Sequence, residues 1–475
     1  MKVKGWFLPL DLRGLVTEER EENRGGIRIA MPVLTPEQMN EIGGRLAEAR
    51  DRVLAERSVE SIVATLDALA LAWLDDETPE RQIALDVLPR ITGTAPAMIR
   101  ESFDLEHASS RADHMMRALR SEFGNPAVLD RFTDNPVLGG AGQTMAIGPT
   151  LTGAVFSSNI PALPHLTVMR SLLVKSAFWG RTSLREPTFL PLYLSTLERL
   201  DPQLASCTAS LYWPSDNRPL ESEFLAKSDC FVGWGGPEAE AHFRAHVPKH
   251  ARFVFHGHRI GFAAVDNESA TDDVAFGIAR DASLFDQQAC LSPHTVFFRG
   301  DMTQAVAFGA RVAQGMRVQA ERLPGRVLTT GEAAAIQQFR GTAEFGEALS
   351  AGRLFTPSDG ALTWTVSVEA ADRFPLSPLN RCITVCAVSS WNEAEHMLRP
   401  VARWLQNAAL AVCRQDAPDL KARFAKLGVT RLCAPGLMAT PSMMWHHDGA
   451  ACLASMVRWC DHETLSPSQL VRTEL

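Results

Sequence analysis

Cys290 differs from the other cysteines of the chain in its polar surroundings. It lies in the segment 286–294, which reads Asp-Gln-Gln-Ala-Cys-Leu-Ser-Pro-His, between an expected helix and an expected strand. The thiolate of a cysteine is a nucleophile, and a helix or loop terminus can lower the pKa of a thiol and offer backbone N–H donors to an oxyanion. Taken alone, this setting still favours a buried structural cysteine, so both interpretations stay open here.

Asn159 is a second residue that could act in acyl chemistry. The segment 157–161, Ser-Ser-Asn-Ile-Pro, follows an expected strand and precedes an expected helix. A side-chain amide in such a loop can donate a hydrogen bond to an oxygen that becomes negative during the reaction. An asparagine that holds a turn or caps the next helix is the favoured interpretation when the segment is considered alone.

A glycine-rich segment, Gly-Trp-Gly-Gly-Pro at 233–237, joins an expected strand to an expected helix. The amino-terminal end of such a helix can bind a phosphate group. The complete G-x-G-x-x-G pattern is missing, because Glu238 occupies the position of the third glycine. By itself the segment therefore favours an ordinary glycine-rich turn.

The histidines offer a rival chemistry. His256 and His258 form an H-x-H pair, and the segment 446–448 reads His-His-Asp, so four such groups could bind zinc. Their spacing matches no compact zinc motif, and we expect no metal. The chain also lacks H-E-x-x-H, G-x-S-x-G and G-x-x-x-x-G-K-[ST], which argues against a zinc protease, an α/β-hydrolase and a P-loop enzyme.

The order of helical and extended segments indicates the scaffold that must position these residues. Residues 35–120 show helical periodicity that begins at Pro36. From about residue 145, apolar runs of strand length alternate with helical stretches, and a second alternation begins near residue 257. We therefore expect an α/β protein with two doubly wound parallel sheets and a helical N-terminal layer, in which ligands bind beyond the carboxyl ends of the strands.

The expected elements can be given by their residues. In the first alternation, the strands are 145–148, 153–156, 176–180, 209–213, 230–233 and 252–255, and the helices are 163–174, 189–200 and 237–245. In the second, the strands are 295–298, 362–368 and 382–388, and the helices are 270–282, 302–322, 392–407 and 418–426.

Length, composition and charge exclude several classes of protein. The chain has 475 residues, 46% of them hydrophobic and 21% charged, which is typical of a soluble globular protein. The net charge of -8 argues against nucleic acid as the main partner. No apolar run approaches the ~18 residues of a membrane span, and the N-terminus does not resemble a secretory signal. Nine irregularly spaced cysteines predict reduced thiols in the cytoplasm.

Three segments carry a resemblance to a known family. They are Asp-Gln-Gln-Ala-Cys-Leu-Ser-Pro at 286–293, Ser-Pro-Leu-Asn-Arg at 377–381, and Trp-His-His-Asp-Gly at 445–449 followed by Val-Arg-Trp at 457–459. They resemble the acyl-CoA reductase family typified by the fatty acid reductase of bacterial bioluminescence (LuxC-like), within the aldehyde dehydrogenase superfamily. The resemblance covers about residues 145–463.

The resemblance implies a domain organisation and a homo-oligomer. The expected units are residues 1–255, with the N-terminal helices and a dinucleotide-binding domain; residues 256–440, a catalytic domain that carries the cysteine nucleophile; and residues 441–475, a segment that returns to the core or to an oligomer interface.

The resemblance also assigns roles to individual residues. It implies that Asn159 is the oxyanion donor and that Gly233, Gly235 and Gly236 lie near the cofactor pyrophosphate. Arg181 falls where most members of the superfamily carry a lysine near the adenosine ribose, and an arginine there suits the 2′-phosphate of NADPH, with NADH as the alternative.

Phe255 falls where aldehyde-oxidising members carry their general-base glutamate. The loss of that base leaves water poorly activated for hydrolysis of a thioester, which favours acyl reduction or acyl transfer over aldehyde oxidation.

The activity implied is the NADPH-dependent reduction of an activated acyl group, from acyl-CoA or a related thioester or acyl ester, to an aldehyde through an acyl-Cys290 intermediate. His294 or His258 would assist proton transfer. The implied partners are a ligase, a transferase or a carrier protein that supplies the acyl group. Two alternatives remain: an acyl transferase or thioesterase that uses the same cysteine, and a non-catalytic scaffold that binds an acyl carrier.

Overall fold

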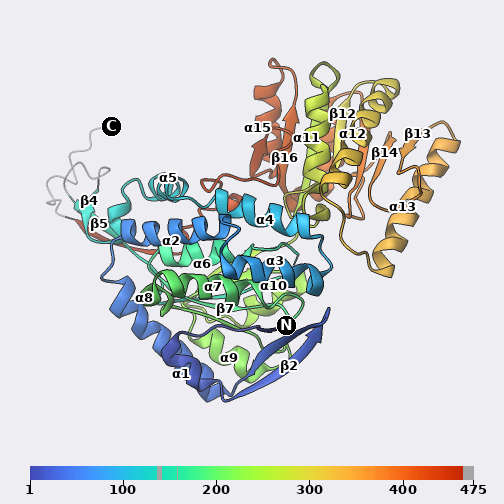
Figure 1. Ribbon diagram of the computed structural model, residues 1–475. Coiled ribbons are helices and arrows are strands. Elements are labelled where there is room, and N and C mark those ends of the chain that lie inside the picture. Colours follow the sequence, from blue (N-terminus) through green and yellow to red (C-terminus); the bar gives the residue numbers. More distant parts are fainter. Residues whose placement is uncertain (136–141, 158, 464–475) are drawn as a thin grey trace, which may run out of the picture.

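The computed structural model describes residues 1–135, 142–157 and 159–463 (Figure 1). Ser158 and the end of the expected C-terminal segment, residues 464–475, lie outside the described residues. Within these ranges no helix combines the length and the apolar character needed to cross a membrane. All nine cysteines are free.

A parallel five-stranded sheet forms the centre of the first half of the molecule. Its order, β10-β9-β6-β7-β8, is doubly wound because the chain starts in the middle and runs outward to each edge. The inner strands are apolar and buried, as expected for a parallel sheet covered by helices on both faces. The strands are β6 (Leu151–Val155), β7 (Ala177–Arg181), β8 (Thr208–Leu211), β9 (Cys230–Trp234) and β10 (Arg252–His256). The helices between them are α6 (Pro164–Leu173), α7 (Phe189–Leu200), α8 (Pro202–Ala205), α9 (Arg218–Ala226) and α10 (Pro237–His246).

The expected N-terminal helical layer is present and packs on this sheet (Figure 1). It begins where Thr35 and Gln38 form a capping box ahead of an apolar face. Its helices are α1 (Pro36–Ala49), α2 (Val59–Leu74), α3 (Pro79–Thr92), α4 (Pro96–Ala108) and α5 (Ala112–Phe123). A small sheet precedes them, made of β1 (Lys2–Lys4), β2 (Glu18–Arg24) and β3 (Ile27–Val33). The sequence analysis missed this sheet, since β2 consists of polar residues only.

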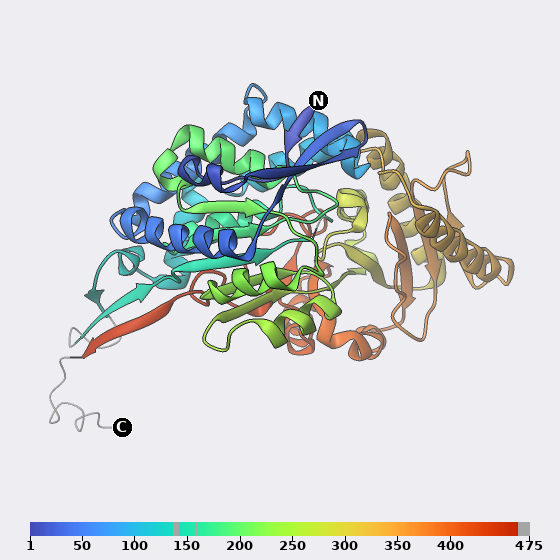
Figure 2. The same ribbon diagram turned by 90° about the horizontal axis from the view of Figure 1, so that it is seen from below.

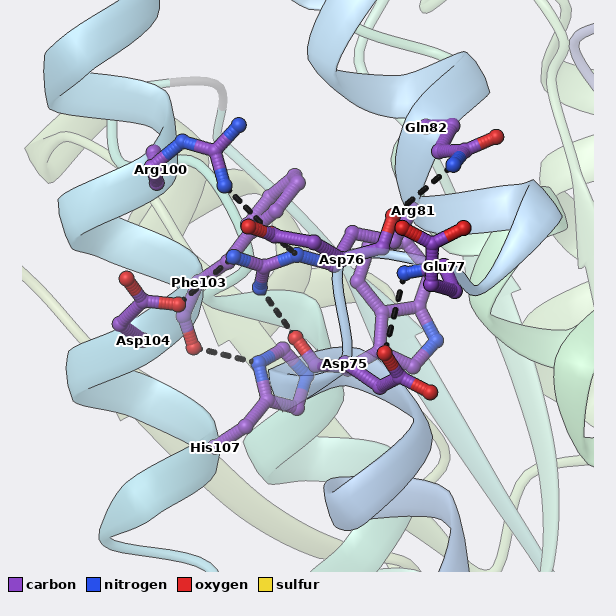
Figure 3. Close-up of polar contacts among 10 residues, drawn as sticks. Asp75, Asp76, Glu77, Arg81, Gln82, Arg100, Phe103, Asp104 and His107 are labelled. Atoms are coloured by element: carbon purple, nitrogen blue, oxygen red, sulfur yellow. Dashed lines mark hydrogen bonds and ion pairs between the residues drawn. The ribbon is translucent and has the colours of Figure 1, made fainter.

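Arg81 of α3 ties three elements of the layer together (Figure 3). Its side chain is 1% exposed and donates to the Asp104 carboxylate of α4 at 2.7 Å and to the Asp76 carboxylate at 3.1 Å. It also donates to the carbonyl oxygen of Trp73, at the end of α2. A buried guanidinium with three acceptors is well satisfied, and it fixes α4 relative to α2 and α3.

A seven-stranded sheet forms the second half of the molecule, with the order β13-β14-β15-β12-β11-β16-β17. All its neighbouring strands are parallel except β13 and β14. The strands are β11 (Ile260–Asp266), β12 (Pro293–Arg299), β13 (Gly352–Phe355), β14 (Thr365–Glu369), β15 (Cys382–Val388), β16 (Leu405–Ala411) and β17 (Arg431–Cys433). The helices are α11 (Asp272–Ser283), α12 (Met302–Arg322), α13 (Thr330–Ala348), α14 (Trp391–Leu398) and α15 (Ala417–Leu427).

The expected helix 392–407 is wrong in its second half. The helix α14 ends at Leu398, a 3-10 turn with Pro400 in its first turn follows, and β16 begins at Leu405. The apolar run of β16 is buried between β11 and β17, so its strand character comes from the sheet around it.

The chain returns to the first half at its C-terminal end (Figure 2). The strand β18 (Arg458–Glu463) pairs antiparallel with β5 (Gly142–Ile147), which also pairs with β4 (Thr133–Asp134). The expected strand 145–148 therefore exists, outside the parallel sheet. The division of the chain into units at residues 255 and 440 stays a prediction.

Candidate active site

A cavity of about 790 Å³ lies where the two halves meet, beyond the carboxyl ends of strands of the five-stranded sheet. Its lining includes six of the expected catalytic and cofactor residues: Asn159, Gly235, Gly236, His258, Cys290 and His294. Apolar side chains line part of it, and they come from the N-terminal layer, α6 and the C-terminal segment: Leu105, Leu166, Met169, Met443 and Leu453. The cavity therefore joins a cysteine to an apolar surface that suits a hydrocarbon chain.

The loop that carries Cys290 has an unusual backbone. Phe285, Asp286 and Gln287 all have positive φ, at 55°, 51° and 63°, a region that residues other than glycine rarely adopt. The Asp286 carboxylate accepts a hydrogen bond from Arg381 Nε at 2.7 Å, and both side chains are almost wholly buried. This ion pair holds the loop in a conformation that its own sequence disfavours.

A second left-handed turn locks the first one. Leu379, Asn380 and Arg381 also have positive φ, and the Asn380 backbone N–H donates to the Asp286 carbonyl oxygen at 3.1 Å. The Gln287 amide donates to the carbonyl oxygens of Pro293 at 2.6 Å and Cys382 at 2.9 Å. The segment 377–381, which the resemblance singled out, is thus a clamp on the Cys290 loop.

Cys290 is half-buried in the cavity wall. Burial raises the pKa of its thiol to about 12, the Asp448 charge raises it further, and Arg259 opposes both. Among the described residues, no oxygen accepts the Cys290 backbone N–H, which lies beside the residue's own sulfur and can donate to an oxyanion formed there. Near neutral pH the group is therefore a thiol, and attack requires removal of its proton.

Asn159 faces the Cys290 loop. Its side-chain Nδ2 donates to the Gln288 carbonyl oxygen at 3.0 Å, and its Oδ1 accepts from the Ser157 hydroxyl at 2.6 Å. These two bonds fix the amide two residues from the cysteine, with one N–H left over. The arrangement fits the oxyanion role expected from the sequence.

The helix α4 supports both loops from the N-terminal layer. The Ser102 hydroxyl donates to the Pro161 carbonyl oxygen at 2.6 Å, next to the Asn159 loop. The sulfur of Met98 accepts the Phe285 backbone N–H at 3.2 Å, in the Cys290 loop. One helix thus fixes the relative positions of the two expected catalytic residues.

Gly233 and Arg181, two of the expected cofactor residues, are not among the residues that line the cavity. A side chain at Gly233 would collide with the Phe255 ring, so this glycine serves packing. The Arg181 guanidinium donates to the Trp213 carbonyl oxygen at 2.9 Å. Phe255 lies over Gly233 and is likewise absent from the described lining.

The other expected cofactor residues fit a dinucleotide. Gly236 is the N-cap of α10, and both Gly235 and Gly236 border the cavity. The first backbone N–H groups of this helix have no partners within the helix, which suits an anionic phosphate. Arg24 and Arg185 also line the cavity and supply positive charge.

His256, the residue after Phe255, faces the cavity and meets a partner far along the chain. Its Nδ1 lies 2.7 Å from Asp448 Oδ2, and Asp448 Oδ1 accepts from Arg259 Nε at 2.6 Å and from Gln406 Nε2 at 2.8 Å. Burial raises the pKa of Asp448, but the hydrogen bond from His256 and the nearby positive charges outweigh it and hold that pKa well below its usual range. Asp448 is therefore a charged acceptor.

Four rings form a column beside this pair. Ring centroids are 4.2 Å apart for Trp234 and His256, 4.1 Å for His256 and His447, and 4.4 Å for His447 and Trp445. One donor atom each of His256, His447 and Asp448 lies within 4.8 Å of the others, as a metal site would require. The two imidazoles are stacked at 27°, and both Asp448 oxygens are already paired, one with His256 Nδ1 and the other with Arg259 Nε. This geometry does not fit a metal.

The other titratable groups of the cavity lack an orienting carboxylate. His294 has a buried Nδ1 without a hydrogen-bond partner among the described residues, and burial lowers its pKa to about 4. His258 is exposed and lies next to Gly236. Burial raises the pKa of Glu106, on α4, to about 7. Sequence reasoning missed Glu106, and it missed the contact of His256 with Asp448, although it had noted both histidine segments.

Comparison with known proteins gives a match to one family and similarity to individual relatives. The sequence model of the family described as acyl-CoA reductase (LuxC) matches residues 54–459. A protein of Vibrio harveyi named long-chain acyl-protein thioester reductase is 22% identical over 461 residues, covering 96% of this chain and 93% of the relative. Its namesake in Aliivibrio fischeri is 23% identical over 442 residues, covering 92% and 88%.

Solved structures show the fold. Aldehyde dehydrogenase 21 from Physcomitrella patens, in complex with the reaction product succinate, matches with a TM-score of 0.72 at 10% identity, over 98% of this chain and 100% of that chain. The NADP-dependent glyceraldehyde-3-phosphate dehydrogenase from Bacillus halodurans, complexed with NADP, matches with a TM-score of 0.66 at 13% identity, over 94% and 96%. The predicted aldehyde dehydrogenase-like fold is confirmed.

Proposed function

Because the chain belongs to the acyl-CoA reductase (LuxC) family, we propose that it reduces a fatty acyl thioester to the aldehyde, with NADPH as reductant and Cys290 as nucleophile. The observation that carries the proposal is the placement of Cys290 and Asn159 on one cavity, joined through the Gln288 carbonyl. The apolar lining supports a fatty acyl group. Since the two bacterial relatives are named acyl-protein thioester reductases, a protein-bound thioester is the donor we favour over free acyl-CoA.

In this reaction the Cys290 sulfur attacks the acyl carbon, and the donor thiol leaves. Asn159 Nδ2 and the Cys290 backbone N–H stabilise the tetrahedral oxyanion, each such donor contributing ~3 kcal/mol. When bound, NADPH supplies the hydride that reduces the acyl carbon. The same two donors hold the oxygen until the aldehyde departs and Cys290 is free again.

For the cofactor, we propose that Gly235, Gly236 and the first turn of α10 hold the pyrophosphate. Arg185, which borders the cavity, is the guanidinium group that would bind the 2′-phosphate of NADPH. Arg181, predicted from the sequence for this role, lies outside the cavity lining and would have to leave the Trp213 carbonyl oxygen to take part. His258 or His294 would transfer protons near the cofactor. An acyl-supplying ligase, transferase or carrier protein would deliver the substrate.

The test is NADPH consumption with a series of acyl-CoAs, run beside the Cys290→Ala variant and repeated with NADH. We expect aldehyde formation and covalent acyl labelling by wild type, and the loss of both in the variant. Turnover retained by Cys290→Ala would contradict the proposal. Acylation of Cys290 without NADPH oxidation would indicate a transferase instead.

A further inference from the structure

The proposed function does not say which group removes the proton from the Cys290 thiol. The inference about that group rests on the proposed function. Cys290 is a thiol near neutral pH, because burial raises its pKa to about 12. By the sequence resemblance, Phe255 falls where aldehyde-oxidising enzymes carry a glutamate base, and its ring packs over Gly233. Some other group must therefore accept the Cys290 proton as the carbon–sulfur bond forms.

His256 has the geometry of such a base. Its Nδ1–H donates to Asp448 Oδ2 at 2.7 Å, which fixes the tautomer and leaves the Nε2 lone pair as the acceptor. The ring lies between Trp234 and His447 in the column, so its orientation is set by packing as well. His256 and Cys290 line the same cavity, and the described residues provide no hydrogen-bond partner for Nε2.

The surroundings keep His256 neutral and ready to accept a proton. Burial lowers its pKa, the hydrogen bond and charge of Asp448 raise it, and the positive charges of Arg170 and Arg259 lower it. His447, stacked on it, also has a pKa well below its usual range because it is buried. The net direction is downward, so the imidazole is uncharged at pH 7.

The other cavity groups are weaker candidates. His258 and His294 have no carboxylate to orient them, and the low pKa of His294 makes it a poor base. Glu106 is the serious rival, with a pKa of about 7. The Glu106 carboxylate has no hydrogen-bond partner among the described residues to orient it, whereas His256 is held by Asp448.

We propose that His256, oriented by Asp448, is the catalytic base that accepts the Sγ proton of Cys290 when the acyl group is transferred. The S–H bond breaks, the proton moves to Nε2, and the sulfur forms its bond to the acyl carbon. When the bond from that carbon to the donor sulfur breaks, Nε2 returns the proton to the donor thiolate. The step consumes one thioester and one thiol and yields one of each, with no change of oxidation state.

The test uses two reactions of Cys290 in the full-length protein between pH 5 and 10. The first is single-turnover acylation by an acyl-CoA without NADPH, and the second is alkylation by iodoacetamide, followed by mass spectrometry of the Cys290 peptide. The variants are His256→Gln, Asp448→Asn and Glu106→Gln. His396→Asn, an exposed position on α14 outside the cavity lining, is the control for the loss of a histidine.

We expect the wild-type log rates to reach a plateau above a midpoint lower than pH 6.5, because only neutral His256 accepts a proton. His256→Gln should lose the plateau, so that its rate follows hydroxide, and at pH 7 it should be slower by ~100-fold or more. Asp448→Asn should be slower by ~10-fold or more and shift the midpoint, a change that mere loosening of the loop would not produce. His396→Asn should stay within about 3-fold of wild type.

A plateau retained by His256→Gln overturns the proposal, and a plateau lost only in Glu106→Gln assigns the base to Glu106. If His256→Gln does not fold, the pH profile of Asp448→Asn decides: an unchanged midpoint overturns the proposal. The alkylation profile needs neither acyl donor nor hydride. It therefore distinguishes two failures. If only the base is wrongly assigned, His256→Gln keeps the wild-type alkylation profile. If the proposed function is wrong, alkylation is as expected but no aldehyde forms.

Discussion

The side-chain amide of Asn159 is the smallest feature on which the proposed chemistry depends. It is held by Ser157 and by the Gln288 carbonyl, so it is oriented before substrate binds. A donor that is already in place stabilises the developing charge without reorganisation.

Asn159→Ala should lower the rate of Cys290 acylation and of aldehyde formation by ~100- to 1,000-fold, with a smaller change in KM. Asn159→Asp has the same shape without the N–H donors and should lose a comparable amount. Stopped-flow measurement of acylation and of NADPH oxidation checks both. A loss below about 3-fold in Asn159→Ala would show that the Cys290 backbone N–H suffices.

At the residue scale, the residues adjacent to Cys290 and Asn159 in the sequence marked these two as candidates for catalysis, and the family resemblance assigned their roles. It could not indicate that His256 meets Asp448, because the two are 192 residues apart and neither has a local signature of the contact. The sequence showed that His256 follows Phe255, but it did not show on which face of β10 the His256 side chain lies. Long-range partners depend on the fold, which is why sequence reasoning stopped short of the base.

At the scale of elements, two left-handed turns hold the nucleophile. The loop 285–287 and the turn 379–381 each hold three positive-φ residues, and the buried Asp286–Arg381 pair connects them. Such a backbone is unfavourable by itself, so the clamp must offset it. The segment 377–381 was recognised from the resemblance, yet its role became visible only in the structure.

Arg381→Met should lower the free energy of unfolding by about 3–5 kcal/mol, because it leaves the Asp286 charge buried without its partner. The double variant Asp286→Asn, Arg381→Met removes both charges and should regain part of the stability while Cys290 remains misplaced. Urea denaturation gives the stability, and the acylation rate gives the position of Cys290. Equal stability of Arg381→Met and wild type would show that the pair contributes little.

Element boundaries followed from the sequence where local signals agree. The helix α12 was predicted over 302–322 and spans Met302–Arg322, since the Asp301 capping box marks its start. The strand β16 was misread because Leu405–Ala411 contains alanines and leucines that suit a helix as well. Its place between β11 and β17 decides its conformation, and that place is a property of the whole sheet.

At the scale of the whole molecule, the N-terminal layer does more than cover a sheet. Arg81 fixes α4 beside α2 and α3 (Figure 3). In turn, α4 contacts the Asn159 and Cys290 loops through Ser102 and Met98. Sequence reasoning predicted this layer as helical but could assign it no part in the site, because helical periodicity carries no information on which loop a helix will meet.

The contact between this layer and α6 makes stability depend on pH through His165 of α6, which is fully buried against His107 of α4. Burial lowers its pKa to about 4, whereas the unfolded chain titrates it near ~6.5. Between these values the unfolded state binds the extra proton, so the stability present above pH ~6.5 is lost as pH falls toward 4.

His165→Asn removes this titration. The unfolding free energy of wild type minus that of the variant should therefore fall by about 3 kcal/mol from pH 7.5 to pH 4. Because the difference between two proteins is measured, the opposite titrations of Glu106 and Asp281 cancel. Urea denaturation at several pH values checks the slope, and parallel curves would contradict it.

The distances along the chain between partners in the cavity give the enzyme an order of maturation during its synthesis. Gln288 follows Asn159 by 129 residues, Arg381 follows Asp286 by 95, and Asp448 follows His256 by 192. At ~5–20 residues per second, ribosomes need on the order of ten seconds or more to make the last of these intervals. Until Arg381 is made, the nascent chain carries the Cys290 thiol without its clamp, and until Asp448 is made, His256 lacks the carboxylate that orients it. With the proposed roles of Cys290 and His256, we expect an unfinished polypeptide to react slowly with acyl donors, and Cys290 to become reactive only when translation is almost complete.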